Sequence, residues 1–232
     1  TVDYRGRLRT TSIKGGVLWE GESSFQAGEA PVFGDLDGDG SIELVALNGN
    51  KTKLVVLEVR RGRVLHTFQV GNKVSCRPVL ADLHTVRGRE ILAPLASGQL
   101  AAYRYGEKKQ LWIRKVSSRA IAAPPAVFDV NRDGVHDLVL STFEGELIFL
   151  NGKNGAEMTK TSLGAAATGV VLLADINGDE RLDVVVQLED GRVSTFTLNR
   201  PCTGKANPWP SQSGGSRRSG SPRHKTLKSD LN

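Results

Sequence analysis

The chain has 232 residues and a formal net charge of +6, and its length suits one sizeable globular domain. It contains no apolar run of about 18 residues, so no transmembrane helix is predicted. The positive charge does not indicate a nucleic-acid-binding domain, because residues 201–232 hold six basic residues and one acidic residue, a net of +5. Residues 1–200 therefore hold 25 basic and 24 acidic residues, a net of +1, and are nearly neutral.

Short apolar segments separated by turn residues follow one another along the chain, and none has a sustained helical period. Residues 1–30 contain two strand-like pieces, which look like the second half of a repeat. From residue 30 onward, groups of four strands are predicted, and the last group has no clear fourth strand. The predicted strands are 4–9 and 16–20; 30–36, 42–47, 54–59 and 64–70; 77–83, 90–96, 99–105 and 110–116; 126–130, 137–142, 146–150 and 157–162; 169–176, 183–188 and 192–198.

A repeat organises these strands. Four aspartates that follow the first strand of each group, Asp35, Asp82, Asp129 and Asp175, are 47, 47 and 46 residues apart. Four short strands in a repeat of about 45 residues are typical of a β-propeller blade. We therefore predict an all-β fold, a β-propeller of four-stranded antiparallel blades over residues 1–200, with about four blades visible. It is either a small closed propeller, with the N-terminal strands completing the fourth blade, or part of a larger one. A β-sandwich is the structural alternative.

An acidic loop follows three of these first strands, with oxygen-bearing side chains at positions 1, 3, 5 and 9. Clustered carboxylates repel one another unless a hard cation lies among them. An EF-hand is excluded, because its twelfth position would fall inside a predicted strand. The predicted metal ligands, with main-chain carbonyls at position 7, are Asp35, Asp37, Asp39, Ser41 and Glu43; Asp129, Asn131, Asp133, Val135 and Asp137; and Asp175, Asn177, Asp179, Arg181 and Asp183. The alternative is a set of solvated acidic turns without an ion.

The segments 33–45 and 174–186 resemble FG-GAP/VCBS repeats, the calcium-binding blades of integrin α-subunit propellers and of many surface proteins. The resemblance covers about residues 15–200. It implies a propeller with Ca²⁺ in two or three loops between the first and second strands of a blade. It also implies an extracellular, cell-surface or secretory-lumen setting, periplasmic in a bacterium. The resemblance does not identify a ligand, because a fold does not determine a function.

Two loops depart from the pattern. The loop after Asp82 keeps Glu90 at position 9 but has His84 and Val86 at positions 3 and 5, so we predict no ion there. We expect the positive charges of Arg87 and Arg89 to lie near the acids of this loop in place of an ion. The last loop has Glu180 where the first and third have glycine, so its turn forms without glycine's conformational freedom.

Three further features leave alternatives open. Cys76 and Cys202 either pair or are unrelated thiols. Asn50, Lys51 and Thr52 form an N-glycosylation sequon on a predicted exposed turn. The basic Pro/Ser/Gly-rich segment 201–232 is predicted to be a flexible tail. Such a tail would make at most weak contacts with polyanions or an acidic membrane surface, and no specific nucleic-acid binding is expected.

No nucleophile elbow, phosphate loop or zinc-ligand spacing occurs in the sequence, which favours a binding module over an enzyme. The leading hypothesis is a calcium-stabilised extracellular or luminal propeller that makes adhesion-type contacts with a protein or glycan. One alternative is an enzyme or enzyme-associated propeller, polysaccharide-active or quinoprotein-like. Another is a purely architectural part of a larger surface assembly.

Overall fold

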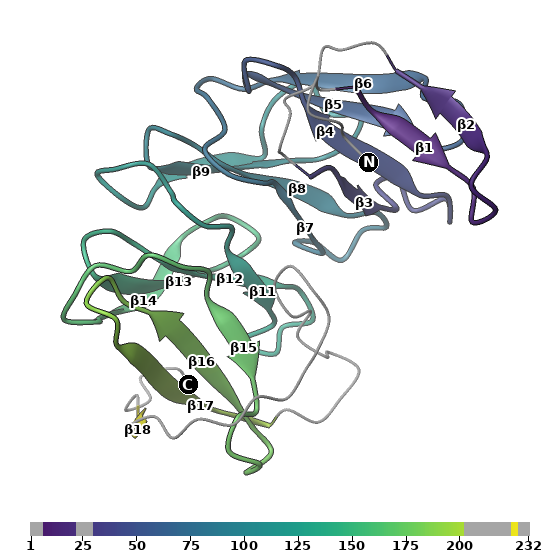
Figure 1. The fold of residues 1–232 in the computed structure, drawn as a ribbon. Helices are drawn as coiled ribbons and strands as arrows, with labels where there is room; N and C mark the ends of the chain where they lie inside the picture. The colour runs from purple at the N-terminus through teal and green to yellow at the C-terminus, as the bar shows by residue number, and fades with distance from the viewer. Residues whose placement is uncertain (1–6, 22–29, 202–223, 227–232) are drawn as a thin grey trace. The chain divides into compact units, whose positions relative to one another are not determined.

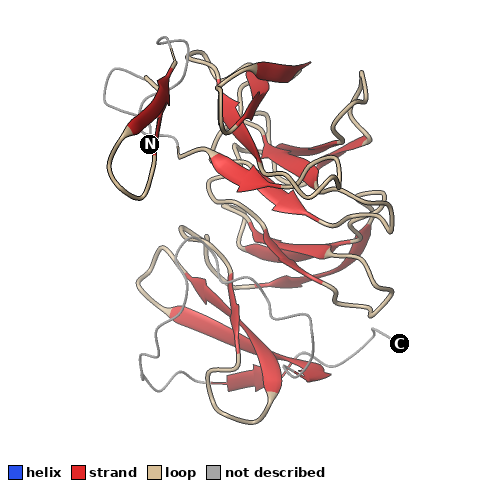
Figure 2. Ribbon diagram, turned by 90° about the vertical axis from the view of Figure 1, so that its right-hand side faces the viewer, coloured by secondary structure: helices blue, strands red, loops and turns tan. Residues whose placement is uncertain are grey.

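The computed structural model describes residues 7–21, 30–201 and 224–226. Figure 2 shows that the described residues form strands and loops and no helix, so none of them forms a helix that could span a membrane. The all-β prediction is confirmed. The chain divides into two compact units, residues 1–82 with 86–121 and residues 83–85 with 122–232, which are described separately.

The first unit contains two four-stranded antiparallel sheets, and in each sheet the strands lie side by side in chain order (Figure 1). The first blade consists of β3 (Val32–Gly34), β4 (Glu43–Leu47), β5 (Lys53–Glu58) and β6 (Val64–Gln69). The second blade consists of β7 (Val79–Ala81), β8 (Glu90–Pro94), β9 (Gln99–Tyr103) and β10 (Trp112–Lys115). Each blade begins with a strand of three residues, shorter than the sequence predicted, because the acidic loop begins directly after it.

The two blades of the first unit pack face to face through one apolar core. Val45 and Val56 of the first blade share this core with Ile91 and Ala101 of the second, and all four are buried. The rings of Phe68 and Tyr103 lie 5.1 Å apart between centroids. The strands β4 and β8 are buried along their whole length, as expected for sheets covered on both faces.

An N-terminal hairpin covers the other face of the first blade. It consists of β1 (Arg9–Thr11) and β2 (Val17–Glu20), which form a two-stranded sheet of their own. Leu8 and Trp19 pack against Leu44 and Leu57, and the indole Nε1 of Trp19 donates a hydrogen bond to the Val59 carbonyl at 2.5 Å. Of the two alternatives, completion of the fourth blade by the N-terminal strands is therefore not found, because the apolar side chains of these strands pack against the first blade.

The second unit repeats the blade arrangement (Figure 1). The third blade consists of β11 (Ala126–Phe128), β12 (Asp137–Ser141), β13 (Glu146–Leu150) and β14 (Glu157–Ser162). The fourth blade consists of β15 (Leu172–Ala174), β16 (Arg181–Gln187), β17 (Val193–Pro201) and β18 (His224–Thr226). A single buried core that includes Val139, Phe149, Val184 and Phe196 joins the two sheets.

The strand β18 differs from the sequence expectation, because it lies in the segment predicted to be a tail. It pairs in parallel with β17, whereas the other strand pairs of this blade are antiparallel. The strand β17 also continues three residues beyond the predicted end at residue 198. Residues 202–223 and 227–232 lie outside the described residues, so flexibility of the tail and a Cys76–Cys202 disulfide stay predictions.

We expect Trp19→Ala to lower the free energy of unfolding by about 2 kcal/mol, because it removes a half-buried ring and its hydrogen bond to Val59. Urea unfolding followed by circular dichroism measures this change. The matched control is Leu18→Ala on the same strand, since Leu18 is 55% exposed and its truncation should change stability by less than about 0.5 kcal/mol. Equal effects of the two substitutions would contradict the docking of the hairpin through Trp19.

Candidate metal loops

Each candidate loop joins the first strand of a blade to the second and spans nine positions. Backbone pairing closes it at its ends, where Gly34 lies opposite Glu43, Phe128 opposite Asp137 and Ala174 opposite Asp183. The residue before position 1 is therefore always the cross-strand partner of position 9. This register explains why the acids recur at a fixed spacing, since the strands on either side hold both ends of the loop.

The position 9 acids are buried and accept hydrogen bonds from the backbone of their own loops. Glu43, Asp137 and Asp183 are 4%, 0% and 0% exposed. Their carboxylates accept the backbone N–H of position 2, from Leu36 at 2.8 Å, Val130 at 3.1 Å and Ile176 at 3.1 Å, respectively. These bonds tie the beginning of each loop to the start of the next strand and satisfy buried amides.

The environment of Glu43 and Asp137 opposes the ionisation of these two acids. Burial raises the pKa of Glu43 above its ordinary value, an effect partly offset by the Leu36 amide, and the negative charges of Asp37, Asp39 and Asp35 raise it further. Burial likewise raises the pKa of Asp137, although amides of three residues donate to its carboxylate. A cation close to either loop would favour the ionised form of these acids.

The side chains at positions 1, 3 and 5 accept three hydrogen bonds that are common to all three loops: position 1 accepts from the N–H of position 6, position 3 from that of position 5, and position 5 from that of position 7. In the first loop, the Asp35 carboxylate accepts N–H bonds from Gly38 and Gly40, that of Asp37 accepts one from Asp39, and that of Asp39 accepts one from Ser41. The fourth loop, from Asp175 to Arg181, has all four corresponding bonds. The third loop has three of them, and in place of the bond from position 4 the N–H of Asp133 donates to Asp129. The side chains at these positions thus accept hydrogen bonds from backbone N–H groups of their own loop, and these bonds fix the shape of the loop.

In the first loop the three aspartates also converge. Asp35, Asp37 and Asp39 each offer a carboxylate oxygen, and these oxygens all lie within 4.8 Å of one another. Hydrogen bonds from Ser41 lower the pKa of Asp39, which keeps that group ionised. In the third and fourth loops, Asn131 and Asn177 replace the carboxylate at position 3 with an amide oxygen. A set made only of oxygen donors fits a hard cation such as Ca²⁺.

The loops need a left-handed backbone at positions 4 and 6, where glycine alternates with other residues. Position 4 is Gly38, Arg132 or Gly178, with φ of 77°, 63° and 79°; position 6 is Gly40, Gly134 or Glu180, with φ of 90°, 84° and 61°. The prediction that Glu180 turns without glycine's freedom is therefore confirmed. Arg132 is a second strained position, which the sequence reasoning missed.

The second loop is held by ion pairs between its own residues and a neighbouring strand. Arg104 is the residue directly after β9. Its guanidinium donates two hydrogen bonds to the buried Glu90 carboxylate, at 2.8 and 3.0 Å. Arg89 lies 3.8 Å from Asp82, which confirms its predicted place beside that acid. The N–H of Arg89 also donates to the carbonyl of Asp35 at 3.0 Å, so this loop packs against the first acidic loop.

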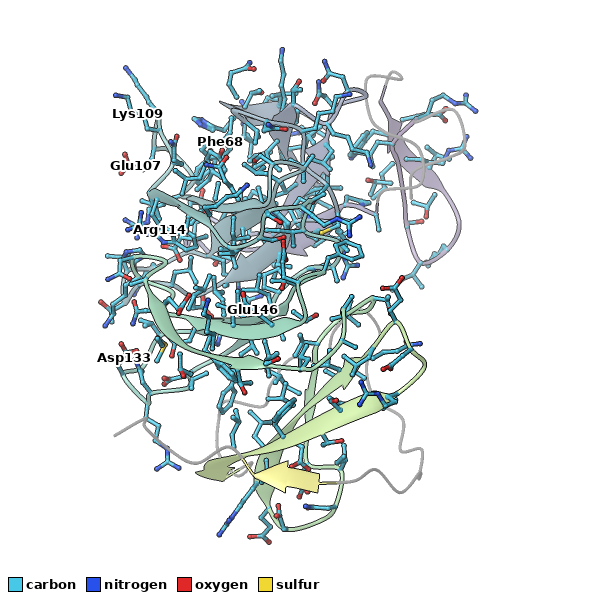
Figure 3. The ribbon with its side chains drawn as sticks, turned by 90° about the vertical axis from the view of Figure 1, so that its left-hand side faces the viewer. Phe68, Glu107, Lys109, Arg114, Asp133 and Glu146 are labelled. Carbon is cyan, nitrogen blue, oxygen red and sulfur yellow. The ribbon has the colours of Figure 1, made fainter. Side chains whose placement is uncertain are left out.

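A lysine from a neighbouring turn forms an ion pair with an acid of the third loop. The ammonium of Lys153, in the turn between β13 and β14, lies 2.9 Å from Asp133, whose position is marked in Figure 3. Burial alone would raise the pKa of Asp133, but the hydrogen bonds from Lys153 and Val135 lower it on balance. Neither Lys153 nor Arg104 was found from the sequence, because each lies in a different strand or turn from the acid that it contacts.

Two other predicted features have definite places. Asn50 is exposed in the turn between β4 and β5, as the sequence predicted for the sequon. Its side-chain oxygen accepts the hydroxyl of Thr52 at 2.5 Å. Cys76 is half-buried in the first unit, before β7.

Comparisons with known proteins agree with this architecture. Residues 129–186 match the family model for the FG-GAP-like repeat. The BBSome complex member BBS2 of Mus musculus is 27% identical over 154 residues, which are 66% of this chain, and the chain spans only 19% of its length. The biofilm matrix protein Bap1 of V. cholerae has a TM-score of 0.63 at 22% identity, covering 87% of this chain and 32% of that chain. The N-terminal part of BBS1, in complex with ARL6, has a TM-score of 0.58 at 15% identity, covering 82% and 57%.

Four-stranded antiparallel blades at a fixed period, an FG-GAP-like repeat and these structural similarities define the class of the protein. The described chain has a β-propeller fold, and residues 129–186 match the FG-GAP-like repeat. The predicted resemblance and the predicted fold class are confirmed, while calcium binding and the individual metal ligands stay predictions.

We expect Glu180→Gly to raise the free energy of unfolding by about 0.5–1 kcal/mol, because glycine adopts a φ of 61° without strain. Gly134→Ala should lower the free energy of unfolding by about 1 kcal/mol for the converse reason. Urea unfolding of each variant measures both changes. The matched control is Glu189→Gly in the following turn, which has no left-handed backbone to relieve. Stabilisation by this control as well would contradict the assignment of strain to Glu180.

We expect Asp137→Ala to lower the free energy of unfolding by about 3 kcal/mol or more in the presence of a chelator, because Val130, Asn131 and Gly152 then lose the acceptor of their amides. Asp133→Ala should cost about 1 kcal/mol or less under the same conditions, since its side chain is partly exposed. Urea unfolding in chelator compares the two. Similar costs would show that the position 9 acid is not the structural tie of the loop.

Proposed function

We propose that this chain is a calcium-stabilised propeller segment that acts as a protein-interaction module within a larger chain or assembly. The observation that carries the calcium role is the oxygen cluster of Asp35, Asp37 and Asp39. The same sequence spacing and the same backbone hydrogen bonds recur in the third and fourth loops, which argues for one shared role.

The residues that would hold the ion are the side chains at positions 1, 3 and 5 and the main-chain carbonyl at position 7. The buried position 9 acids, at the start of the second strand, would add negative charge or a further ligand oxygen. In the first loop, Asp35, Asp37, Asp39 and Glu43 bring four carboxyl groups together, and the bound cation would supply the positive charge that relieves their repulsion.

The role proposed for the ion is structural. The acidic loop is the connection between a three-residue first strand and a buried second strand, so a cation there would fasten the edge of the blade. Binding of a ligand to the folded state alone stabilises that state by mass action, by about 2.7 kcal/mol per site at a free concentration 100-fold above Kd. Because extracellular calcium supports even weak sites, we propose an extracellular, cell-surface or luminal setting.

The interaction role is supported by the relatives. The mouse relative is named as a member of the BBSome complex, and the structure of BBS1 contains ARL6 as a partner. A propeller presents many loops on rigid sheets, which suits contacts with other proteins. A glycan partner, adhesion and an enzymatic role stay alternatives suggested by the sequence.

The calcium part is tested by thermal unfolding of the native chain and of Asp129→Ala in calcium, in magnesium and in chelator. We expect calcium, and not magnesium, to raise the unfolding midpoint by about 5–10 °C per saturated site, and Asp129→Ala to lose part of this rise. The matched control is Asp190→Ala, since Asp190 is an exposed turn acid outside the loops. An unchanged midpoint in calcium would refute the calcium role.

The interaction part is tested on the natural protein in an extract of its own cells, by size-exclusion chromatography in calcium and in chelator. We expect the protein to elute in calcium at a mass well above that of its own chain. Elution at the mass of a single chain in both buffers would contradict its place in an assembly, whatever the result of the calcium titration.

A further inference from the structure

Each position 9 acid faces a residue in the blade's third strand or directly after it, and that residue is acidic, basic or uncharged depending on the blade. Glu43 lies opposite Glu58, and Asp183 lies opposite Thr197. By the same register, Glu90 lies opposite Arg104 and Asp137 opposite Asn151, each one residue beyond the last pair of the two strands. Facing residues of adjacent strands lie side by side on the same face of the sheet, so each affects the charge around its acid.

In the second blade the facing residue supplies a cation. The Arg104 guanidinium makes two hydrogen bonds to the buried Glu90, and Arg89 lies beside Asp82. These are the two acids that the second loop retains. A forked guanidinium matches a carboxylate in shape and charge, so the pair needs no further ion.

In the third blade the cation comes from the following turn. An added Cβ on Gly152 would lie 1.8 Å from the carbonyl oxygen of His136, so the turn packs tightly on the loop through a glycine. The amide of Gly152 donates to Asp137 at 3.2 Å, and the next residue, Lys153, reaches Asp133 at 2.9 Å. The ammonium therefore contacts an oxygen of a predicted calcium ligand.

In the first blade, no lysine or arginine of the described residues forms an ion pair with the acids of the loop, although Arg87 and Arg89 of the second loop pack beside it. The facing residue is an acid, Glu58, and its ion pairs are with Arg61 at 3.7 Å and Arg63 at 3.5 Å. Arg60 corresponds by register to Lys153 and makes no ion pair with another described residue. The acids of the first loop thus accept hydrogen bonds from backbone N–H groups and, at Asp39, also from the Ser41 side chain, but form no ion pair with a described residue.

We propose that the second and third blades carry tethered cations in place of, or in competition with, calcium, and that Lys153 weakens the third loop relative to the first. This inference rests on the proposed calcium role. Calcium can coordinate the Asp133 oxygen that Lys153 contacts only after the ammonium group has moved away from it. Its charge also repels a divalent ion at close range.

The test isolates the third loop in a chain that carries Asp39→Ala and Asp179→Ala, two exposed changes that disable the first and fourth loops. Adding Lys153→Met should tighten calcium binding about three- to tenfold in isothermal titration with calcium chloride. The matched control is Lys160→Met, which removes a lysine paired with Glu146 at 3.0 Å. Figure 3 shows Glu146 and Asp133 at separate places in the third blade.

Each outcome has one meaning. Tighter binding with Lys153→Met and no change with Lys160→Met supports the inference. Equal affinities with and without Lys153, or the same gain with Lys160→Met, overturn it and leave the proposed calcium role standing. If the native chain binds no calcium, the proposed function itself fails. A second measurement uses Lys153→Met in the otherwise native chain, whose calcium-dependent rise in unfolding midpoint should exceed that of Lys160→Met at subsaturating calcium.

Discussion

The interaction on which the first, third and fourth blades depend is the hydrogen bond from the backbone N–H of loop position 2 to the buried carboxylate at position 9. A first strand of three residues offers few ladder bonds of its own, and the carboxylate extends the connection into the loop. The same bond places an acid under the loop, where water is excluded and negative charge is unfavourable. In the first and third blades burial raises the pKa of this acid, so positive charge nearby would favour its ionised form.

The groups near this acid differ from blade to blade. In the second blade, Arg104 brings a fixed guanidinium to the acid through the neighbouring strand. In the third, amides of three residues hold Asp137 while Lys153 approaches the outer acid of the loop. In the fourth, the hydroxyl of Thr197 donates to Asp183 at 2.6 Å. The first blade has the largest concentration of carboxylates and a further acid, Glu58, across the sheet, which makes it the loop best suited to a free cation.

Stability and recognition have separate sources in this architecture. The apolar faces of the sheets are covered by neighbouring blades and, on the first blade, by the hairpin with Trp19. The second loop has His84 and Val86 at positions 3 and 5, and its blade still forms a four-stranded sheet. Repeats built in this way tolerate variation at loops and turns, where contacts with partners are made.

The sequence by itself determined the all-β fold, the period of 46 to 47 residues, the bounds of β13 and β14, and the acids of three loops. These features are local, since alternation of apolar residues, turn residues and loop spacing depends on neighbours in the chain. Only the tertiary structure decided which cation faces each acid and where the ends of the chain pack. Arg104 and Lys153 lie 14 and 20 residues from their acids, so their contacts depend on strand register. The hairpin packs on the first blade because Leu8 and Trp19 find an apolar face there, which no local pattern specifies.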